Sequence, residues 1–363
     1  MIRATGGLEQ LELADVPDPA VPLGPHAVRV ALRAAALNQL DLFVVRGLPI
    51  QYRFPHILGA DGAGVVEATG AAVRSVRPGD RVMLNPGIAD DTCEYCRSGE
   101  QSLCVNYQLL GEHLPGTLAQ YIVVPERNVA AIPSLPTPLT WPEAAAFSLV
   151  TLTAWHMVMT RARVRSGETV LIWGIGGGVA LAALRIAKLQ GARVIVTSGS
   201  DAKLAAARQL GADVGLNHRS SKVSQEVRAL TARRGAEVVI DSVGEATWEE
   251  SLRSLSRGGR LVSCGATSGP RASLDLRRLF WHQWSLLGST MGSDAEYREV
   301  VRLLAAGELR PVLDRVFPFA EGRAAAARLA AGEQFGKIAI ELPDTAASPA
   351  GRGAGATGGP SRN

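Results

Sequence analysis

The chain has 363 residues, of which 47% are hydrophobic and 20% charged, and its formal net charge is +4. This length and composition are typical of a soluble globular protein with about two domains. The basic residues are scattered among acidic ones, without a basic stripe interleaved with aromatic residues, so we expect no nucleic-acid partner.

The N-terminus and the lengths of the hydrophobic runs indicate the cellular compartment of the protein. Residues 1–9 have no apolar signal-peptide core. No uninterrupted apolar run approaches the ~18 residues that a membrane span needs. We therefore expect a cytoplasmic protein that does not associate with membranes.

The chain up to about residue 148 is predicted to be rich in β-strands. Short apolar segments separated by glycine and proline turns predict strands at residues 28–32, 64–68, 81–84 and 121–124. Between the last two strands, Cys93, Cys96 and Cys104 crowd into one polar loop, a pattern that favours a metal site over disulfides in a reducing compartment.

Residues 169–180 form the most informative motif. An apolar, β-branched run ends at four glycines within five residues, and a strong helix-forming segment follows. A strand, a glycine turn and a helix together cradle a pyrophosphate, because glycines allow close backbone approach and the free amides of the helix N-terminus face the negative charge. A second strand at 193–197 completes a βαβ unit. The motif predicts dinucleotide binding; the alternative is an ordinary tight turn.

Strands and helices alternate from residue 143 to the 280s. Strands are expected to begin near residues 170, 193, 214, 237, 260 and 285, with amphipathic helices between several of them. This alternation predicts an α/β fold with a doubly wound parallel sheet. A helix at 295–306, a strand at 312–317, a helix at 321–331 and a strand at 337–342 should follow, and a Gly/Ala/Ser/Pro-rich tail at 343–363 should be disordered.

Several ordered motifs then match one family: the segments 36–47, 59–66, 76–82 and 152–155 together with the glycine turn. On these, the chain resembles the medium-chain dehydrogenase/reductase superfamily, specifically its quinone-oxidoreductase-like, zeta-crystallin-like branch. The resemblance implies a β-rich GroES-like catalytic domain from residues 1–148 and 292–342, and a Rossmann domain from residues 149–291. It also implies an active site in the cleft between the two domains and a homodimer formed through Rossmann sheet edges.

The resemblance raises the question of a catalytic zinc ion. Zinc alcohol dehydrogenases of the superfamily bind it with a Cys, a His-Glu pair and a further Cys. The corresponding positions here hold Asn38, the pair Ala60–Asp61, and Leu149 or a neighbour. Zinc needs thiolate, imidazole or carboxylate ligands, and only Asp61 supplies one. We therefore expect no catalytic metal.

A structural zinc ion is a separate question. Relatives that have one use four cysteines spaced C-x2-C-x2-C-x7-C; here Cys93, Cys96 and Cys104 occupy the last three places and Asp90 the first. A carboxylate oxygen is an acceptable zinc ligand, so we expect one structural zinc ion. The alternatives are an eroded site with three free thiols, or Asp91 in place of Asp90.

The predicted cofactor is NADP(H), held at the glycine turn by Gly174, Gly177, Gly178 and Val179. Ser198 occupies the end of the second strand, where NAD-preferring folds have an acid that accepts from the ribose 2′-hydroxyl. Lys203, His218 and Arg219 are candidate contacts to a 2′-phosphate. Alternatively, Lys203 is solvated and Asp201 binds the ribose. The resemblance further implies nicotinamide contacts from the backbone of Gly265 and Ala266, with Lys337 near the pyrophosphate.

Nicotinamide chemistry is hydride transfer, and without zinc the charge that develops on the acceptor oxygen needs hydrogen-bond donors. Asn38, Tyr52 and Thr153 are the candidate donors, and Asp41 is expected to orient its neighbours. Asn38 is nearly as well explained as the cap of a local turn, and Thr153 as a helix start. His56 and His156 are left out, because a lone histidine is more often structural.

These inferences together predict an NADPH-dependent reductase of a quinone or an α,β-unsaturated carbonyl, since both acceptors delocalise charge without a metal. One alternative is a zinc-dependent alcohol dehydrogenase, which should contain about two zinc ions per chain. A catalytically silent NADP-binding regulatory protein is the other.

Overall fold

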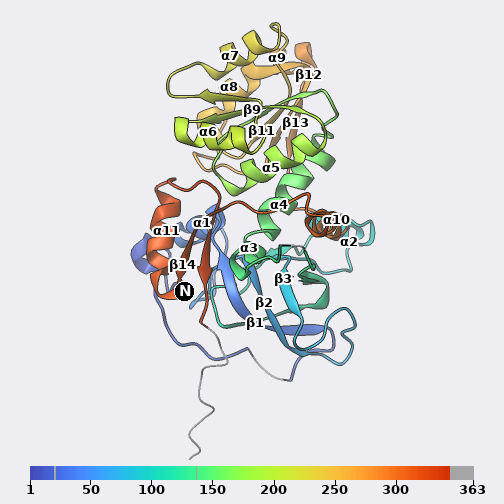
Figure 1. Ribbon diagram of the computed structural model, residues 1–363, viewed down its shortest axis with the longest axis vertical. Coiled ribbons are helices and arrows are strands. Elements are labelled where there is room, and N and C mark those ends of the chain that lie inside the picture. Colours follow the sequence, from blue (N-terminus) through green and yellow to red (C-terminus); the bar gives the residue numbers. More distant parts are fainter. Residues whose placement is uncertain (20–21, 136, 344–363) are drawn as a thin grey trace, which may run out of the picture.

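The computed structural model describes residues 1–19, 22–135 and 137–343, and contains two large β-sheets, one above the other in Figure 1. The predicted disordered tail lies outside the described residues apart from Pro343. No helix in these ranges is long and apolar enough to span a bilayer.

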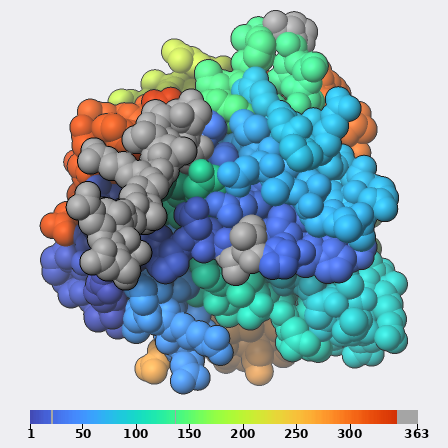
Figure 2. All heavy atoms as spheres, turned by 90° about the horizontal axis from the view of Figure 1, so that it is seen from below, coloured from blue at the N-terminus to red at the C-terminus, as the bar shows by residue number. Residues whose placement is uncertain are grey.

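The lower sheet is built from both ends of the chain. Its strand order is β14-β15-β1-β2-β3-β7, and β6 also pairs with β1. The C-terminal strand β15 pairs with β1 antiparallel, with Ala36 opposite Ala339. Blue N-terminal and orange C-terminal atoms accordingly adjoin in the view from below (Figure 2). The strands are β1 (Ala27–Ala36), β2 (Asp61–Thr69), β3 (Arg81–Leu84), β6 (Tyr121–Pro125), β7 (Val129–Ala131), β14 (Leu313–Pro318) and β15 (Lys337–Glu341).

The upper sheet is parallel throughout, in the order β10-β9-β8-β11-β12-β13. Its central strand β8 is buried along its whole length, as expected for a sheet covered on both faces. Strand order reverses between β8 and β11, which creates the crevice where such folds bind ligands. The strands are β8 (Thr169–Ile172), β9 (Arg193–Ser198), β10 (Val214–Asn217), β11 (Ala236–Asp241), β12 (Leu255–Ser263) and β13 (Ser285–Gly288).

Helices cover both sheets and connect them. The long cross-connection is α4, continued by a π-helical turn at His156–Arg161, and α10 packs beside α4 on the return path (Figure 1). A buried hydrogen bond of 2.9 Å between Ser148 and Tyr297 joins these two helices. The helices are α1 (Gln39–Arg46), α3 (Trp141–Ala145), α4 (Ser148–Trp155), α5 (Gly178–Leu189), α6 (Asp201–Gln209), α7 (Val223–Leu230), α8 (Glu245–Ser254), α9 (Leu276–His282), α10 (Asp294–Ala305) and α11 (Gly322–Ala330).

A small cysteine-bearing lobe projects from the lower sheet. It contains the two-stranded sheet β4 (Gly87–Ile88) and β5 (Gln108–Leu109), the short helix α2 (Glu94–Arg97) and a 3-10 turn at Gln101–Leu103. Further 3-10 turns lie at Leu8–Gln10, Glu126–Asn128 and Phe319–Glu321.

The predicted fold class is confirmed: a β-rich GroES-like sheet accompanies a parallel Rossmann-like sheet. Most predicted strands begin within three residues of the observed start. The exception is β12, which begins at Leu255 rather than near 260 because Leu255 already pairs with Ala236, ahead of an irregularity in the register. The helix α1 was not predicted from the sequence.

Candidate active site and metal centre

A cavity of about 360 Å³ lies between the two sheets. The lower sheet and its helices contribute Asn38, Phe43 and Lys337 to its wall, and the upper sheet contributes the glycine turn and Cys264. The structure therefore brings residues from both ends and the middle of the chain to one cleft. The cavity has the size and mixed lining of a small-molecule site.

The glycine turn follows β8 and opens directly into α5. Gly174 and Gly176 have φ angles of +69° and +119°, which side chains other than glycine rarely adopt. Gly177 is the N-cap of α5, and a Cβ on Gly178 would lie 2.8 Å from Val150 and 2.9 Å from Lys337. Free helix amides therefore face a close-fitting cradle, which suits the pyrophosphate of a dinucleotide.

Asn38, Asp61 and Lys337 form a buried polar cluster beside this cradle. The Lys337 ammonium donates to Asp61 Oδ2 at 2.8 Å and to Asn38 Oδ1. Asn38 Nδ2 donates to Asp61 Oδ2 at 3.0 Å, and the Leu149 amide donates to Asp61 Oδ1 at 2.9 Å. The Lys337 side chain is 4% exposed and that of Asp61 is 0% exposed. A complete ion pair thus occupies the position that the resemblance assigns to a catalytic metal.

Asp41 holds the backbone around Asn38. Its carboxylate accepts from the Asn38 amide and from the Gly59 amide, both at 2.8 Å, within a capping box at the start of α1. Burial raises the pKa of Asp41 to about 6, against the opposing effect of these two hydrogen bonds. The orienting role of Asp41 in catalysis remains a prediction, and Asn38 is also the N-cap of α1.

The other two candidate donors lie on different elements. Thr153, on α4, lines the cavity, but its hydroxyl donates to the Leu149 carbonyl at 2.7 Å. The Tyr52 oxygen accepts from the Leu48 amide at 3.2 Å, and Leu48 lines the cavity. The roles of both residues remain predictions.

The histidines left out of the prediction have structural partners. His56 contacts the Gly111 carbonyl at 3.0 Å, and His156 contacts Glu296 on α10 at 2.9 Å. Burial is the main cause that lowers the pKa of His56.

The end of β9 faces the predicted 2′-phosphate contacts. Ser198 accepts from the Ser200 amide at 3.2 Å, and the Arg219 guanidinium lies against Gly199, where a Cβ would approach its Nε to 2.6 Å. Asp201, the alternative ribose ligand, accepts from Asn217 at 2.8 Å. His218 adjoins Arg219 in the chain.

Lys203 lies farther toward the lower sheet than the sequence suggested. Its ammonium donates to the Gly332 carbonyl at 2.6 Å, and its Cδ would lie 3.1 Å from a Cβ on Gly176. The amide of Gly336 donates to the Gly176 carbonyl at 2.9 Å, so the loop before β15 docks on the glycine turn. Whether Lys203 contacts a phosphate remains a prediction.

The segment after β12 completes the cleft. Gly265 lines the cavity and Ala266 packs against Gly244. Cys264 is half-exposed at its residue surface, yet burial around its thiol raises the pKa to about 12.

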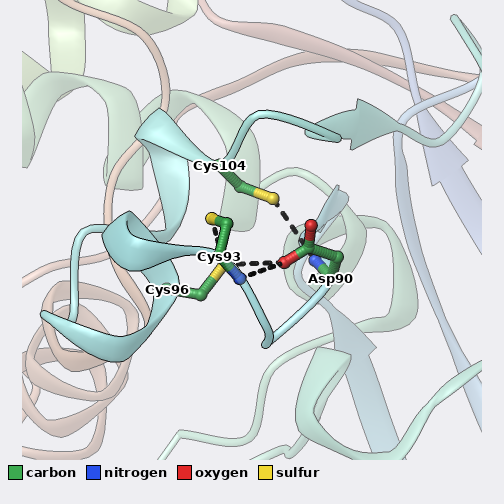
Figure 3. Close-up of side chains that lie close together, drawn as sticks. All are labelled: Asp90, Cys93, Cys96 and Cys104. Atoms are coloured by element: carbon green, nitrogen blue, oxygen red, sulfur yellow. Dashed lines mark hydrogen bonds between the residues drawn. The ribbon is translucent and has the colours of Figure 1, made fainter.

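Four side chains converge in the cysteine lobe: Asp90, Cys93, Cys96 and Cys104 (Figure 3). Their potential ligand atoms all lie within 4.8 Å of one another. In a tetrahedral zinc site with bonds of about 2.0–2.3 Å, ligand atoms lie roughly 3.5–4 Å apart, so the group fits zinc after a small contraction. The cluster can therefore bind zinc.

Asp90 is held as a carboxylate in this cluster. The amides of Thr92 and Cys93 donate to its Oδ1 at 2.8 and 3.1 Å, and Asn106 donates to its Oδ2 at 2.7 Å. These hydrogen bonds hold the pKa of Asp90 well below its usual range. The carboxylate of Asp91, the alternative ligand, instead pairs with Arg127.

Two features of the cleft were not predicted from the sequence. Glu112 lines the cavity from the segment after β5, and the pairing of Lys337 with Asp61 spans 276 residues of chain. The polar sequence Gly111-Glu112-His113 was the only signal for the first, and no local pattern signals the second.

Comparisons with known proteins agree with this arrangement. Residues 24–134 match the alcohol dehydrogenase GroES-like domain, and residues 178–306 match the zinc-binding dehydrogenase family. The chain is 33% identical to a quinone oxidoreductase of Pseudomonas aeruginosa, over 93% of this chain and 97% of the relative. The chain belongs to the medium-chain dehydrogenase/reductase superfamily.

Two further members of the superfamily differ in their described activity. An acryloyl-coenzyme A reductase of Metallosphaera sedula is 32% identical over 85% of this chain and 89% of the relative. The crystal structure of an NAD-dependent alcohol dehydrogenase is 44% identical and superposes with a TM-score of 0.90, covering 94% of this chain and 98% of that one. The protein is therefore an oxidoreductase of the medium-chain superfamily.

Proposed function

We propose that this protein reduces a quinone or an α,β-unsaturated carbonyl with NADPH, without a catalytic metal ion. The observation that carries the proposal is the buried ammonium of Lys337, which is hydrogen-bonded to Asn38 and Asp61. A second cation beside it would be repelled and would lack thiolate or imidazole ligands. Conjugated acceptors need no metal, because they spread the incoming negative charge.

The side chains of the cleft support this chemistry in different ways. Bound NADPH supplies a hydride from C4 of its nicotinamide ring. The Lys337 ammonium places positive charge at the cavity wall, which favours negative charge developing on an acceptor oxygen. Asn38 has its amide protons committed to Asp61 and Ala36, whereas Tyr52 makes no donor contact among the described residues. We propose Asn38 and Asp41 as positioning residues, and Tyr52 and Thr153 as contacts to the substrate.

We propose that the cofactor is NADP(H) rather than NAD(H), because of the residues around the end of β9. Ser198 leaves hydroxyl donors and no acid at the strand end, and Arg219 lies over Gly199. Arginine matches phosphate geometry well. Gly174, Gly177, Gly178 and Val179 would hold the pyrophosphate. The other residues that we propose to contact the cofactor are Lys203, His218, Gly265, Ala266 and Lys337.

We also propose one structural zinc ion, held by Asp90, Cys93, Cys96 and Cys104, and a homodimer. The free edge strand β13 and the neighbouring helix α9 support the dimer: Leu276, Phe280 and Trp281 are 65–67% exposed. Exposed apolar side chains beside an open sheet edge are typical of an interface. The division into residues 1–148 with 292–342, and 149–291, is likewise a proposal that the two separate sheets support.

The test of the activity is oxidation of NADPH in the presence of simple quinones and enones, with NADH as comparison. Arg219→Gln should raise the Kd of NADPH about 10- to 100-fold, because a charge-assisted hydrogen bond contributes about 1.5–3 kcal/mol. It should leave the Kd of NADH unchanged. The exposed Arg208→Gln on α6 is the matched control. No turnover with any acceptor, despite tight NADPH binding, would favour the silent regulatory alternative.

An alcohol dehydrogenase is the second candidate, favoured by the 44% identity to the NAD-dependent alcohol dehydrogenase structure. Metal analysis separates the two: about one zinc ion per chain supports the reductase, and about two support the alcohol dehydrogenase. Turnover of simple alcohols with NAD⁺ that is lost with a chelator would overturn our proposal.

A further inference from the structure

Glu112 is an acidic side chain in the cleft to which the proposed function assigns no role. Among the described residues that line the 360 Å³ cavity, it is the one carboxyl group. It follows Gly111, whose φ of +76° turns the chain after β5 toward the cleft. Leu48 and Leu109 line the same cavity.

The carboxyl group of Glu112 is half-buried and faces the cavity without a hydrogen-bond donor among the described residues. Its side chain is 14% exposed, and His113 Nδ1, which accepts from the Leu109 amide, lies 3.9 Å from its Oε2. Its oxygens make no hydrogen bond within residues 1–19, 22–135 and 137–343. Because partial burial removes water from the charged form, this carboxyl group gains from being protonated or from contacting a ligand.

We propose that Glu112 is the acid that protonates the α-carbon of an α,β-unsaturated carbonyl substrate. This inference rests on the proposed function and concerns the reduction of α,β-unsaturated carbonyls rather than of quinones. As hydride from the dihydronicotinamide bonds to the β-carbon, the C=C electrons move toward the carbonyl. The Glu112 O–H bond then breaks and a C–H bond forms at the α-carbon. Water returns a proton to the Glu112 carboxylate, so one NADPH and one proton are consumed for each saturated carbonyl formed.

The groups around Glu112 favour its protonated form more than solvent does for an exposed glutamate. Burial raises the pKa of Glu112, and His113 opposes this shift. Tyr52 and Tyr107 are the other titratable groups that interact with it, and burial raises the pKa of both. Lys337 and Cys264, the other titratable side chains of the cavity wall, are respectively committed to Asp61 and held as a thiol by burial.

The experiment compares Glu112→Gln with the wild type, and uses Glu308→Gln, at an exposed glutamate outside the cavity, as the control. The enone rate of Glu112→Gln should fall about 100-fold or more, as expected on loss of a general acid. The quinone rate should fall less, because water protonates oxygen quickly. The wild-type rate of enone reduction should decline as the pH rises through the pKa of Glu112. This decline should be absent in Glu112→Gln.

Two further readouts separate proton donation from a structural role. Wild-type reduction in D₂O should place deuterium on one face of the α-carbon, and Glu112→Gln should give both faces. In the free protein, the infrared band of the protonated Glu112 carboxyl group, taken as the difference from Glu112→Gln, should persist to a higher pH than the band of an exposed glutamate.

The outcomes distinguish this inference from the proposed function. Equal enone rates and equal α-carbon stereochemistry in wild type and Glu112→Gln would overturn the role of Glu112 alone. Quinone turnover without any enone turnover in the wild type would also overturn it, and would leave the reductase proposal standing. Absence of both activities would overturn the proposed function itself.

Discussion

Asp61 and Asp90 both occupy positions where, by the resemblance, zinc-binding relatives have metal ligands or their neighbours, but their surroundings differ in chemistry. Asp61 lies in the cleft and is saturated by an ammonium, a side-chain amide and a backbone amide. Asp90 lies in the cysteine lobe among three sulfur atoms. The same residue type thus closes an internal ion pair in one region and joins a cluster of potential zinc ligands in the other. What surrounds a carboxylate, rather than the carboxylate itself, decides whether a metal fits.

The largest expected effect comes from removing the ammonium beside Asp61. Lys337→Met should lower the free energy of unfolding by about 3–5 kcal/mol, because it leaves a buried carboxylate without its partner. Urea denaturation measures this. Lys188→Met is the control, since the Lys188–Asp213 pair is about one-third exposed and contributes at most about 1 kcal/mol.

A second variant tests the assignment of the partner. Adding Asp61→Asn to Lys337→Met should restore part of the lost stability, because the uncompensated charge is gone. If Lys337→Met lowers the free energy of unfolding no more than Lys188→Met does, Lys337 is not the counter-ion that keeps the cleft free of metal.

The next effect is a dependence of the free energy of unfolding on pH between about 4 and 7, caused by Asp41. Burial raises the pKa of Asp41 to about 6 from its ordinary 3.8. The native protein binds this proton more tightly than the unfolded chain does. The contribution of Asp41 to the free energy of unfolding is therefore fully present below about pH 4, and it is lost as the pH rises through 6. The loss is roughly 3 kcal/mol, at 1.36 kcal/mol for each pKa unit.

Asp41→Asn should remove this part of the pH profile, and the difference between the variant and the wild type from pH 4 to 7 is the quantity to measure. Asp15→Asn, at an exposed position, should leave the profile parallel to that of the wild type. Parallel profiles for Asp41→Asn would show that Asp41 titrates normally.

The smallest effect concerns Asp90 as a zinc ligand. Asp90→Asn should weaken zinc binding by at least about 10-fold, because loss of a partner that only contacts a ligand already weakens metal affinity by about 10- to 100-fold. Competition with a chromophoric chelator measures the affinity, and elemental analysis gives the zinc content. Cys104→Ser should remove zinc altogether, whereas Asp61→Asn should retain about one ion per folded chain. Unchanged zinc affinity in Asp90→Asn would instead assign the fourth ligand to another group.

Local sequence patterns were sufficient for much of the molecule. The glycine turn predicted the strand, the cradle and the helix at the correct residues, because glycine at positive φ and a helix N-terminus are properties of a short segment. The spacing of the three cysteines with Asp90 likewise predicted the cluster, since all four ligands come from one loop.

Tertiary structure decided what lies in the cleft. Lys337 was expected near the pyrophosphate, and its stem does lie against Gly178, but its ammonium reaches Asn38 and Asp61. Glu112 enters the cavity from a loop whose course the sequence does not specify. Periodicity and spacing report neighbours along the chain. The contacts of Lys337 with Asn38 and Asp61 arise only when β15 pairs with β1 and brings Lys337 to the start of α1.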